Sequence, residues 1–183
     1  GYPLRSLFLM NPEIVIHAGT FSKNMFPSLR LGYMVVPESI ASDILMTKEK
    51  IQMRTPAQIQ LATAHFMKSG AFTRNIARMK RIYKRKHSLI SQKLSDGFGD
   101  DIEINSNAAG MHLNVSHKKY KFSADDCRKF EEFGVRVDCE ASYSLSGKKG
   151  GLLLGFGNVL EKEIAEGIKR LKKAVDSVIG RIE

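Results

Sequence analysis

Residues 19–33 hold the side chains of this sequence whose types and spacing best suit covalent chemistry. Lys23 lies in a run of small and polar residues between the apolar segments 13–17 and 31–36, which read as two short strands. We therefore expect Lys23 on a loop held by two buried strands, where its ammonium would be partly desolvated. Such an amine is a nucleophile for carbonyl compounds, and Schiff-base formation is the chemistry that suits it best.

Three polar residues near Lys23 could bind a phosphate group. Thr20 and Ser22 offer hydroxyl donors, and Arg30 offers a guanidinium fork seven positions after the lysine. An imine-forming lysine beside a phosphate clamp is the donor set of a pyridoxal 5′-phosphate (PLP) site. The alternative, an exposed lysine in a hairpin loop, is common for a single lysine.

Apolar spacing predicts the elements that position this loop. Helices are expected at residues 38–50, 56–69, 71–94, 123–133 and 161–182, and further strands at residues 102–104, 110–115, 135–137 and 151–156. Ser123 and Asp126 should cap one helix, and Asn158 with Glu161 could cap the last. The long helix should end at residues 96–100. Strands and helices that alternate in this way indicate a sheet covered by helices on one face.

Composition excludes some classes of protein. The chain has 183 residues, is 43% hydrophobic and contains no apolar run of about 18 residues, so no membrane partner and a cytoplasmic location are expected. The two cysteines, Cys127 and Cys139, fit no metal or redox spacing and read as reduced thiols. We predict no metal site, because the five histidines share no ligand spacing.

The net charge of +10 leaves two interpretations open. Basic residues concentrate between residues 68 and 86, on one predicted helix that lacks the aromatic interleaving typical of single-strand binding. This pattern favours a solvated helix face, and the alternative is a nucleic-acid-binding domain without a cofactor.

The run from Gly19 to Tyr33 resembles the lysine loop of fold-type I aminotransferases, in which Ser/Thr-x-Ser-Lys is followed by an arginine and Leu-Gly-Tyr. The resemblance implies that Lys23 is the catalytic residue and holds the cofactor aldehyde as a Schiff base. Thr20 and Arg30 would hold the cofactor phosphate. The implied cofactor-binding residues are Lys23, Thr20, Ser22 and Arg30.

The likeness covers nearly the whole chain. Residues 78–87 look like the domain-linking helix of aminotransferase-like proteins, residues 109–113 like part of their small domain, and residues 151–158 like their penultimate strand. With the lysine loop, this combination is closest to the MocR type of GntR-family transcription regulators. Those proteins carry a winged-helix DNA-binding domain ahead of an aminotransferase-like domain.

The expected fold class is therefore α/β, the C-terminal part of a fold-type I PLP-dependent transferase. Residues 1–70 would be the C-terminal piece of its large domain, residues 71–97 a long linking helix, and residues 98–183 the small C-terminal α/β domain. Residues 1–12 carry turn signals but no helix or strand period, so we expect the natural chain to extend upstream.

Two departures from the family bear on activity. The PLP-ring aspartate, a nearby tyrosine and a phosphate-binding loop, which the family places upstream of the lysine, are absent from this sequence. We therefore expect weak or no PLP binding by this fragment and no turnover. Leu153 stands where active aminotransferases carry an arginine for the substrate carboxylate, and Arg136 is the alternative candidate for that role.

The resemblance favours a PLP-binding domain of a MocR-type regulator that senses an amino acid or a vitamin B6-related molecule. DNA contact would then come only from a winged-helix domain outside this sequence, and the full-length protein would be a homodimer. The alternative is part of a genuine class I/II aminotransferase that acts on an amino acid.

Overall fold

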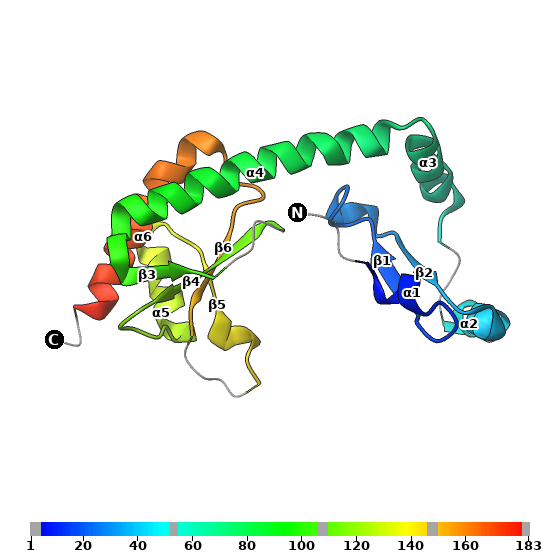
Figure 1. Cartoon of the computed structure of the whole chain (residues 1–183), viewed down its shortest axis with the longest axis horizontal. Coiled ribbons are helices and arrows are strands. Elements are labelled where there is room, and N and C mark those ends of the chain that lie inside the picture. Colours follow the sequence, from blue (N-terminus) through cyan, green and yellow to red (C-terminus); the bar gives the residue numbers. More distant parts are fainter. Residues whose placement is uncertain (1–4, 52–54, 106–109, 146–149, 181–183) are drawn as a thin grey trace. The chain divides into compact units, whose positions relative to one another are not determined.

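Two antiparallel sheets, one in each half of the sequence, organise the described residues, which are 5–51, 55–105, 110–145 and 150–180 of the computed structural model. The chain divides into two units, Gly1–Ala77 (unit 1) and Arg78–Glu183 (unit 2). The long helix α4 (Ala71–Phe98) contributes to both (Figure 1). No helix in the described ranges is long and apolar enough to span a membrane.

Unit 1 is built around a hairpin of β1 (His17–Thr20) and β2 (Gly32–Val35). Helix α1 (Leu7–Met10) precedes the hairpin in sequence, and helices α2 (Glu38–Ile51) and α3 (Ala57–Lys68) follow it. The strand predicted at residues 13–17 is wrong, because residues 12–14 form a turn and pairing begins only at His17. Strand β2 ends at Val35, the partner of His17, so the apolar residues before His17 lie outside the pairing.

The described part of unit 1 has no buried core of its own. None of its Leu, Ile, Val, Met or Phe side chains is buried, and all four residues of β2 are exposed. The expectation of two buried strands is therefore wrong for this chain, since β1 is at most half-buried, at His17 and Gly19, and β2 is exposed. The large apolar side chains left exposed are Leu7, Leu9, Met10, Ile14, Ile16, Phe26, Tyr33, Met34, Val35, Leu45, Met46, Ile51, Leu61 and Met67.

Helix α4 confirms the long helix predicted from residue 71 and continues to Phe98, through the residues expected to terminate it. The reason is packing, because Phe98 in the last turn is buried in the core of unit 2. The helix ends at Gly99, which has a φ of 54° and opens the short 3₁₀ segment Gly99–Asp101. The domain boundaries at residues 70 and 97 stay a prediction.

Unit 2 contains a four-stranded antiparallel sheet in the order β3-β4-β6-β5. Its strands are β3 (Ile102–Ile104), β4 (His112–His117), β5 (Asp138–Cys139) and β6 (Leu152–Gly155), and its remaining helices are α5 (Ala124–Lys129) and α6 (Glu161–Ile179). The strand predicted at residues 135–137 is wrong. Those residues follow a left-handed turn at Gly134, and pairing with β6 starts at Asp138.

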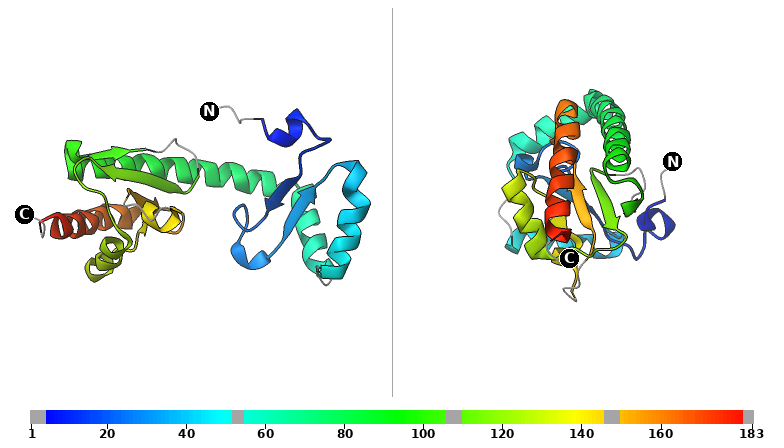
Figure 2. Two further views of the ribbon diagram at one scale, coloured as in Figure 1. Left: turned by 90° about the horizontal axis from the view of Figure 1, so that it is seen from below. Right: turned by 90° about the vertical axis from the view of Figure 1, so that its left-hand side faces the viewer.

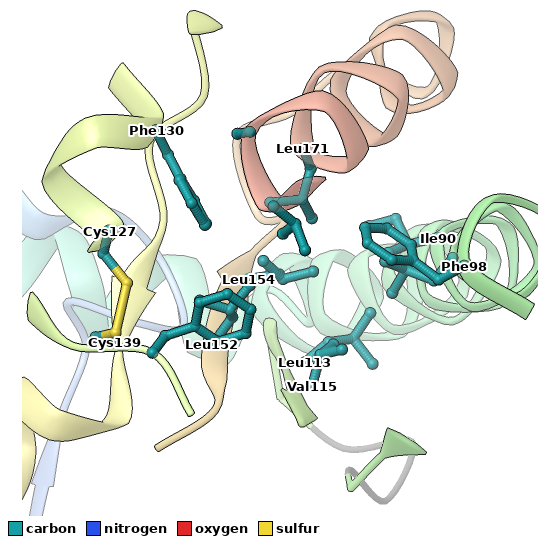
Figure 3. Packing of buried hydrophobic residues seen from close by; sticks show 14 of the residues in the cluster. Ile90, Phe98, Leu113, Val115, Cys127, Phe130, Cys139, Leu152, Leu154 and Leu171 are labelled. Carbon is teal, nitrogen blue, oxygen red and sulfur yellow. A yellow bond between two sulfur atoms is a disulfide. The ribbon is translucent and has the colours of Figure 1, made fainter. Parts of the chain in front are cut away.

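The helices of unit 2 pack on one face of this sheet, as predicted. Leu113 and Val115 of β4 and Leu152 and Leu154 of β6 point into the core, whereas Asn114 between them lies half-buried on the opposite face. Figure 3 shows these side chains meeting residues of α4, α5 and α6. The helix residues in this core are Ile90, Leu94, Phe98, Cys127, Phe130, Ile164, Leu171, Ala174, Val175 and Val178. Ile182, at the end of the predicted last helix, lies outside the described residues.

One of the two predicted helix caps is confirmed. At α5, the Ser123 hydroxyl accepts from the Asp126 backbone N–H at 3.2 Å, and the Asp126 carboxylate accepts from the Ser123 N–H at 2.9 Å. The predicted cap of α6 by Asn158 and Glu161 is wrong. Helix α6 begins at Glu161 as predicted, but its N-cap is Leu160, and the Glu163 carboxylate accepts from the Leu160 N–H at 3.1 Å.

The prediction of two reduced thiols is also wrong in this structure, where Cys127 and Cys139 form a disulfide (Figure 3). Their Cα atoms are 6.2 Å apart, within the range that a disulfide spans. Helix α5 and strand β5 pack together in the core, so two sulfur atoms 12 positions apart in sequence meet there. Sequence spacing alone could not show that contact.

Candidate functional site

The loop that carries Lys23 connects β1 to β2 and is closed by backbone hydrogen bonds. The Phe21 N–H donates to the Leu31 carbonyl at 3.0 Å, which joins the two ends of the loop. Inside it, the N–H groups of Asn24 and Met25 donate to the Phe21 carbonyl at 3.2 and 2.8 Å and form a tight turn around Lys23. The prediction that Lys23 lies on a loop between two strands is confirmed.

The hydroxyl residues predicted for phosphate binding lie together at the start of this loop. The Ser22 N–H donates to Thr20 Oγ1 at 3.1 Å. Because this hydroxyl accepts from the backbone, its own hydrogen remains available to an outside acceptor. Lys23 and Thr20 are exposed and Ser22 is half-buried, so the expected desolvation of the lysine is not present in this chain.

Arg30 is held in an unusual backbone conformation. Its φ is 49° and its ψ is 34°, which makes it the only non-glycine residue with positive φ in the described ranges. The 3₁₀ turn Pro27–Leu29 precedes it, and the Arg30 N–H donates to the Pro27 carbonyl at 3.3 Å. Left-handed backbone at a non-glycine residue is uncommon and concentrates at binding sites. Within the described chain, neither the Arg30 guanidinium nor the Lys23 amine forms a hydrogen bond or ion pair.

Aromatic side chains support the base of the loop. The Tyr33 ring lies against Phe21, with ring centres 5.5 Å apart, and covers the backbone of Gly19. Phe21 also contacts Phe72 at the start of α4, at 6.3 Å. Gly19, the residue opposite Tyr33 in the hairpin, is the signal in the sequence for this close approach.

These side chains fit the cofactor predicted from the sequence. Lys23 presents an amine without a protein partner among the described residues, Thr20 a hydroxyl donor, and Arg30 a cation, all on one closed loop. An amine, a hydroxyl and a guanidinium are the groups that an aldehyde carrying a phosphate ester requires. The loop can therefore supply the lysine and part of the phosphate clamp of a PLP site.

The open face of the sheet in unit 2 carries a second polar group, which sequence reasoning missed. Glu140 accepts from the Gly151 N–H at 2.6 Å and from the Asn114 side-chain amide. The Gly151 hydrogen bond, followed by that from Asn114, lowers the pKa of Glu140 below its ordinary value. Leu153 lies on β6 between Asn114 and Asp138 of the neighbouring strands. Among the described residues, this face thus offers carboxylates and an amide around Leu153, and its strand neighbours there are not arginines.

Arg136 lies on the surface rather than on this face. Its side chain is 90% exposed, and its Nε lies 3.9 Å from Glu131 Oε1. Lys86 of α4 is buried, and its Nζ donates to the carbonyls of Phe156 at 3.4 Å and Gly157 at 3.0 Å. In the part of the chain that the structure describes, no three His, Cys, Asp or Glu side chains gather closely enough to hold a metal ion.

Known proteins resemble this chain over most of its length. The family model of aminotransferase class I and II matches residues 2–150. An HTH-type transcriptional regulator, YhdI of Bacillus subtilis, is 30% identical over 176 residues, which are 95% of this chain and 38% of that protein. The probable rhizopine catabolism regulatory protein MocR of Rhizobium meliloti is 29% identical over 87% of this chain and 33% of its own length. The chain thus spans about two fifths of the curated relatives it matches first.

Solved structures show the same fold. LysN, the α-aminoadipate aminotransferase of Thermus thermophilus, matches 98% of this chain and 47% of its own with a TM-score of 0.86 and 24% identity. An archaeal alanine:glyoxylate aminotransferase matches 90% of this chain and 41% of its own with a TM-score of 0.77 and 26% identity. The fold is thus that of part of a fold-type I PLP-dependent transferase. On the match over residues 2–150, the chain belongs to the aminotransferase class I and II family.

Proposed function

We propose that this chain is the PLP-binding, effector-sensing part of a MocR-type transcription regulator. The observation that carries the proposal is the closed β1–β2 loop, which presents Lys23 with the hydroxyl of Thr20 and the left-handed Arg30. The similarity to HTH-type regulators along most of the chain supports the regulator over an enzyme.

Each residue of the loop has a distinct role in this proposal. The Lys23 amine binds the cofactor covalently, and Thr20, Ser22 and Arg30 hold its phosphate by hydrogen bonds and charge. The turn around Lys23 fixes the start of its side chain, and the Tyr33 ring limits how far the β1 end of the loop can move. When bound, PLP supplies the electron sink and the carbonyl group that an amine effector can recognise.

Leu153 bears on which small molecule is sensed. An apolar side chain cannot pair with a carboxylate, and its neighbours on the open face, Asp138 and Glu140, carry the same charge as that carboxylate. We therefore favour an amine or a vitamin B6-related molecule over an ordinary amino acid as the effector. Arg136 pairs with Glu131 on the surface. It therefore gives no support for the idea that Arg136 replaces the missing arginine and binds the effector carboxylate.

The regulator function also implies partners outside this sequence. Sequence-specific DNA binding would come from a winged-helix domain, the full-length protein would pair as a homodimer, and it would act in the cytoplasm. The second candidate function is part of an aminotransferase, in which Lys23 would also transfer protons. The similarity to aminotransferases of known structure keeps that candidate open.

Borohydride trapping tests the proposal. The chain is incubated with excess PLP, reduced, digested and analysed by mass spectrometry, and the expected result is a phosphopyridoxyl group on Lys23. Lys23→Arg should abolish this group, whereas Lys48→Arg, at an exposed lysine of α2, should leave it unchanged. A group spread over many lysines, without preference for Lys23, would reject the PLP site.

A second measurement separates the regulator from the enzyme. Single-turnover mixing of the PLP-loaded chain with amino donors should show no transamination at the rates of natural enzymes, roughly 1 per second or more. Turnover at such rates would favour the aminotransferase. In the longer natural polypeptide, operator binding that changes with PLP would support the regulator.

A further inference from the structure

Helices α4 and α6 enclose a groove in unit 2 that the proposed PLP site does not use. The two helices lie side by side (Figure 2), and the groove between them has a volume of about 400 Å³. We call it the α4–α6 groove, and its lining consists of Lys93, Asp96 and Gly97 from α4 and Ala165, Ile168, Lys169, Lys172 and Lys173 from α6. Four of these eight residues are lysines.

The floor of the groove is apolar. A Cβ atom at Gly97 would lie 3.7 Å from the Ile168 side chain, so the helices approach closely there. Ala165 is small and exposed, and it leaves space beside this contact. Residues 165–173 of α6 cover rather more than two helical turns, a length of roughly 12 Å. A helix that presents apolar side chains at positions i, i+4 and i+7 spans a similar length.

The rim of the groove carries unbalanced positive charge. Lys93 pairs with Asp96 at 3.2 Å, and Lys172 pairs with Asp176 at 2.7 Å. Lys169 and Lys173 lie one helical turn apart, and neither forms an ion pair with a carboxylate in the described ranges. Like charges at this spacing repel each other, so an acidic partner would be favoured at this rim.

From this combination we infer that the α4–α6 groove docks an acidic amphipathic helix of a partner protein. The apolar stripe of such a helix would cover Gly97, Ala165 and Ile168, and its flanking Asp or Glu residues would pair with Lys169 and Lys173. Duplex DNA fits less well, because a phosphate backbone offers nothing apolar to the floor. Single-stranded nucleic acid requires aromatic stacking, and no aromatic residue is present in the lining.

This inference goes beyond the proposed PLP function and does not require PLP. The test measures binding of a fluorescein-labelled helical peptide to the whole chain by fluorescence anisotropy. The peptide carries leucines at every third or fourth position and glutamates elsewhere. Lys169→Gln with Lys173→Gln should weaken binding about five- to tenfold, because two exposed ion pairs are lost. The control, Lys48→Gln with Lys50→Gln in α2, removes the same charge from exposed positions and should change the Kd by less than about twofold.

Two further variants keep the test decisive. Ala165→Glu places a carboxylate on the floor and should abolish binding while the circular dichroism spectrum of the chain stays the same. A peptide of identical composition with its leucines scattered around the helix should bind at least about fivefold more weakly. If both peptides bind equally well, or if the two double lysine variants lose the same affinity, binding reflects charge attraction alone and the inference is overturned. Tighter binding of a duplex of about 20 base pairs that depends on Lys169 and Lys173 would overturn it in favour of a nucleic-acid surface.

Discussion

The aromatic ring of Tyr33 lies directly over Gly19, its partner across the β1–β2 hairpin. A Cβ atom at Gly19 would lie 2.3 Å from Cζ of this ring, a distance that carbon atoms do not tolerate. Only glycine therefore allows the ring to cover the strand one residue before Thr20. The ring and the start of the lysine loop are coupled by this contact.

Gly19→Ala should displace the Tyr33 ring and disturb the lysine loop. We expect the yield of borohydride-trapped PLP on Lys23 to fall about fivefold or more, since overpacking costs about 1–3 kcal/mol. In a Tyr33→Ala background, Gly19→Ala should leave this yield unchanged, because no ring then clashes with the added methyl group. Gly167→Ala serves as the control, since its methyl group would meet no atom within 4 Å apart from the neighbouring backbone of its own helix. Equal yields for Gly19→Ala and wild type, with Tyr33 present, would disprove the coupling.

Lys86→Met should destabilise unit 2 through two carbonyl groups. The buried ammonium donates to the Phe156 and Gly157 carbonyls, and methionine fills similar space without a donor. Leaving these acceptors unpaired should lower the free energy of unfolding by about 1–3 kcal/mol, measured by urea titration. Lys84→Met, at an exposed position of the same helix, should change it by less than about 0.5 kcal/mol. Similar midpoints for the two variants would contradict a structural role of Lys86.

The Cys127–Cys139 disulfide should stabilise unit 2 against denaturant. Closing a loop of this length restricts the unfolded chain and contributes about 3 kcal/mol. We expect a thiol reductant to lower the urea midpoint of the wild type and to leave that of Cys127→Ala/Cys139→Ala unchanged. Intact mass under non-reducing conditions gives an independent reading, and two free thiols in the purified protein would contradict the disulfide.

His117 should make unit 2 less stable in mild acid. Burial lowers the pKa of this histidine, Lys172 and Lys119 lower it further, and Asp101 and Asp176 oppose the change. Its Nδ1 accepts from the Lys119 N–H at 3.3 Å, which requires an unprotonated nitrogen. The unfolded state then binds the proton more readily than the folded state, so stability is full above the ordinary pKa of 6.5.

As pH falls from about 6.5 through the lower pKa of the folded state, the free energy of unfolding should therefore decrease. His117→Gln should remove this part of the pH dependence, as measured by urea titrations at several pH values. Parallel curves for the variant and the wild type would show that His117 does not titrate with unfolding.

The two units should differ in hydrogen exchange. Unit 1 exposes most of its large apolar side chains, and its two-stranded hairpin is marginal without further packing. Amide hydrogens of β1, β2 and α2 should be slowed only about tenfold relative to an unstructured peptide, because the formed hairpin opens at little cost. Those of β4, β6 and α6 should be slowed at least about a thousandfold in the same sample. Comparable protection in both units would indicate that the 183-residue chain covers the apolar faces of unit 1 by itself.

Much of the fold could be predicted because helical periodicity is strong in this sequence. The apolar stripes predicted α2, α3, α4 and α6 within a few residues, and the Ser123–Asp126 pair predicted a cap that the structure contains. Strands were harder, because a short apolar run does not say which neighbour it pairs with. Residues 13–17 and 135–137 read as strands, yet pairing begins only at His17 and Asp138.

The site was predictable where its residues are adjacent in sequence. Lys23, Thr20, Ser22 and Arg30 share one loop, so their spacing alone was enough to group them. Contacts between distant segments could not be found in this way. The Glu140–Gly151 hydrogen bond, the Lys86 contact with Phe156 and the disulfide all join elements whose proximity follows from the sheet order.

That sheet order also affects how the protein is made. Strand β6 lies between β4 and β5, although it is the last of the three to leave the ribosome. Until it emerges, β4 can pair only with β3, and β5 lacks the strand it pairs with in the described sheet. Helix α6 follows still later and supplies Leu171 and Val175 to the core. Unit 2 must therefore fold after its synthesis is nearly complete. Until then, its unpaired strand edges are exposed to chaperones and to aggregation.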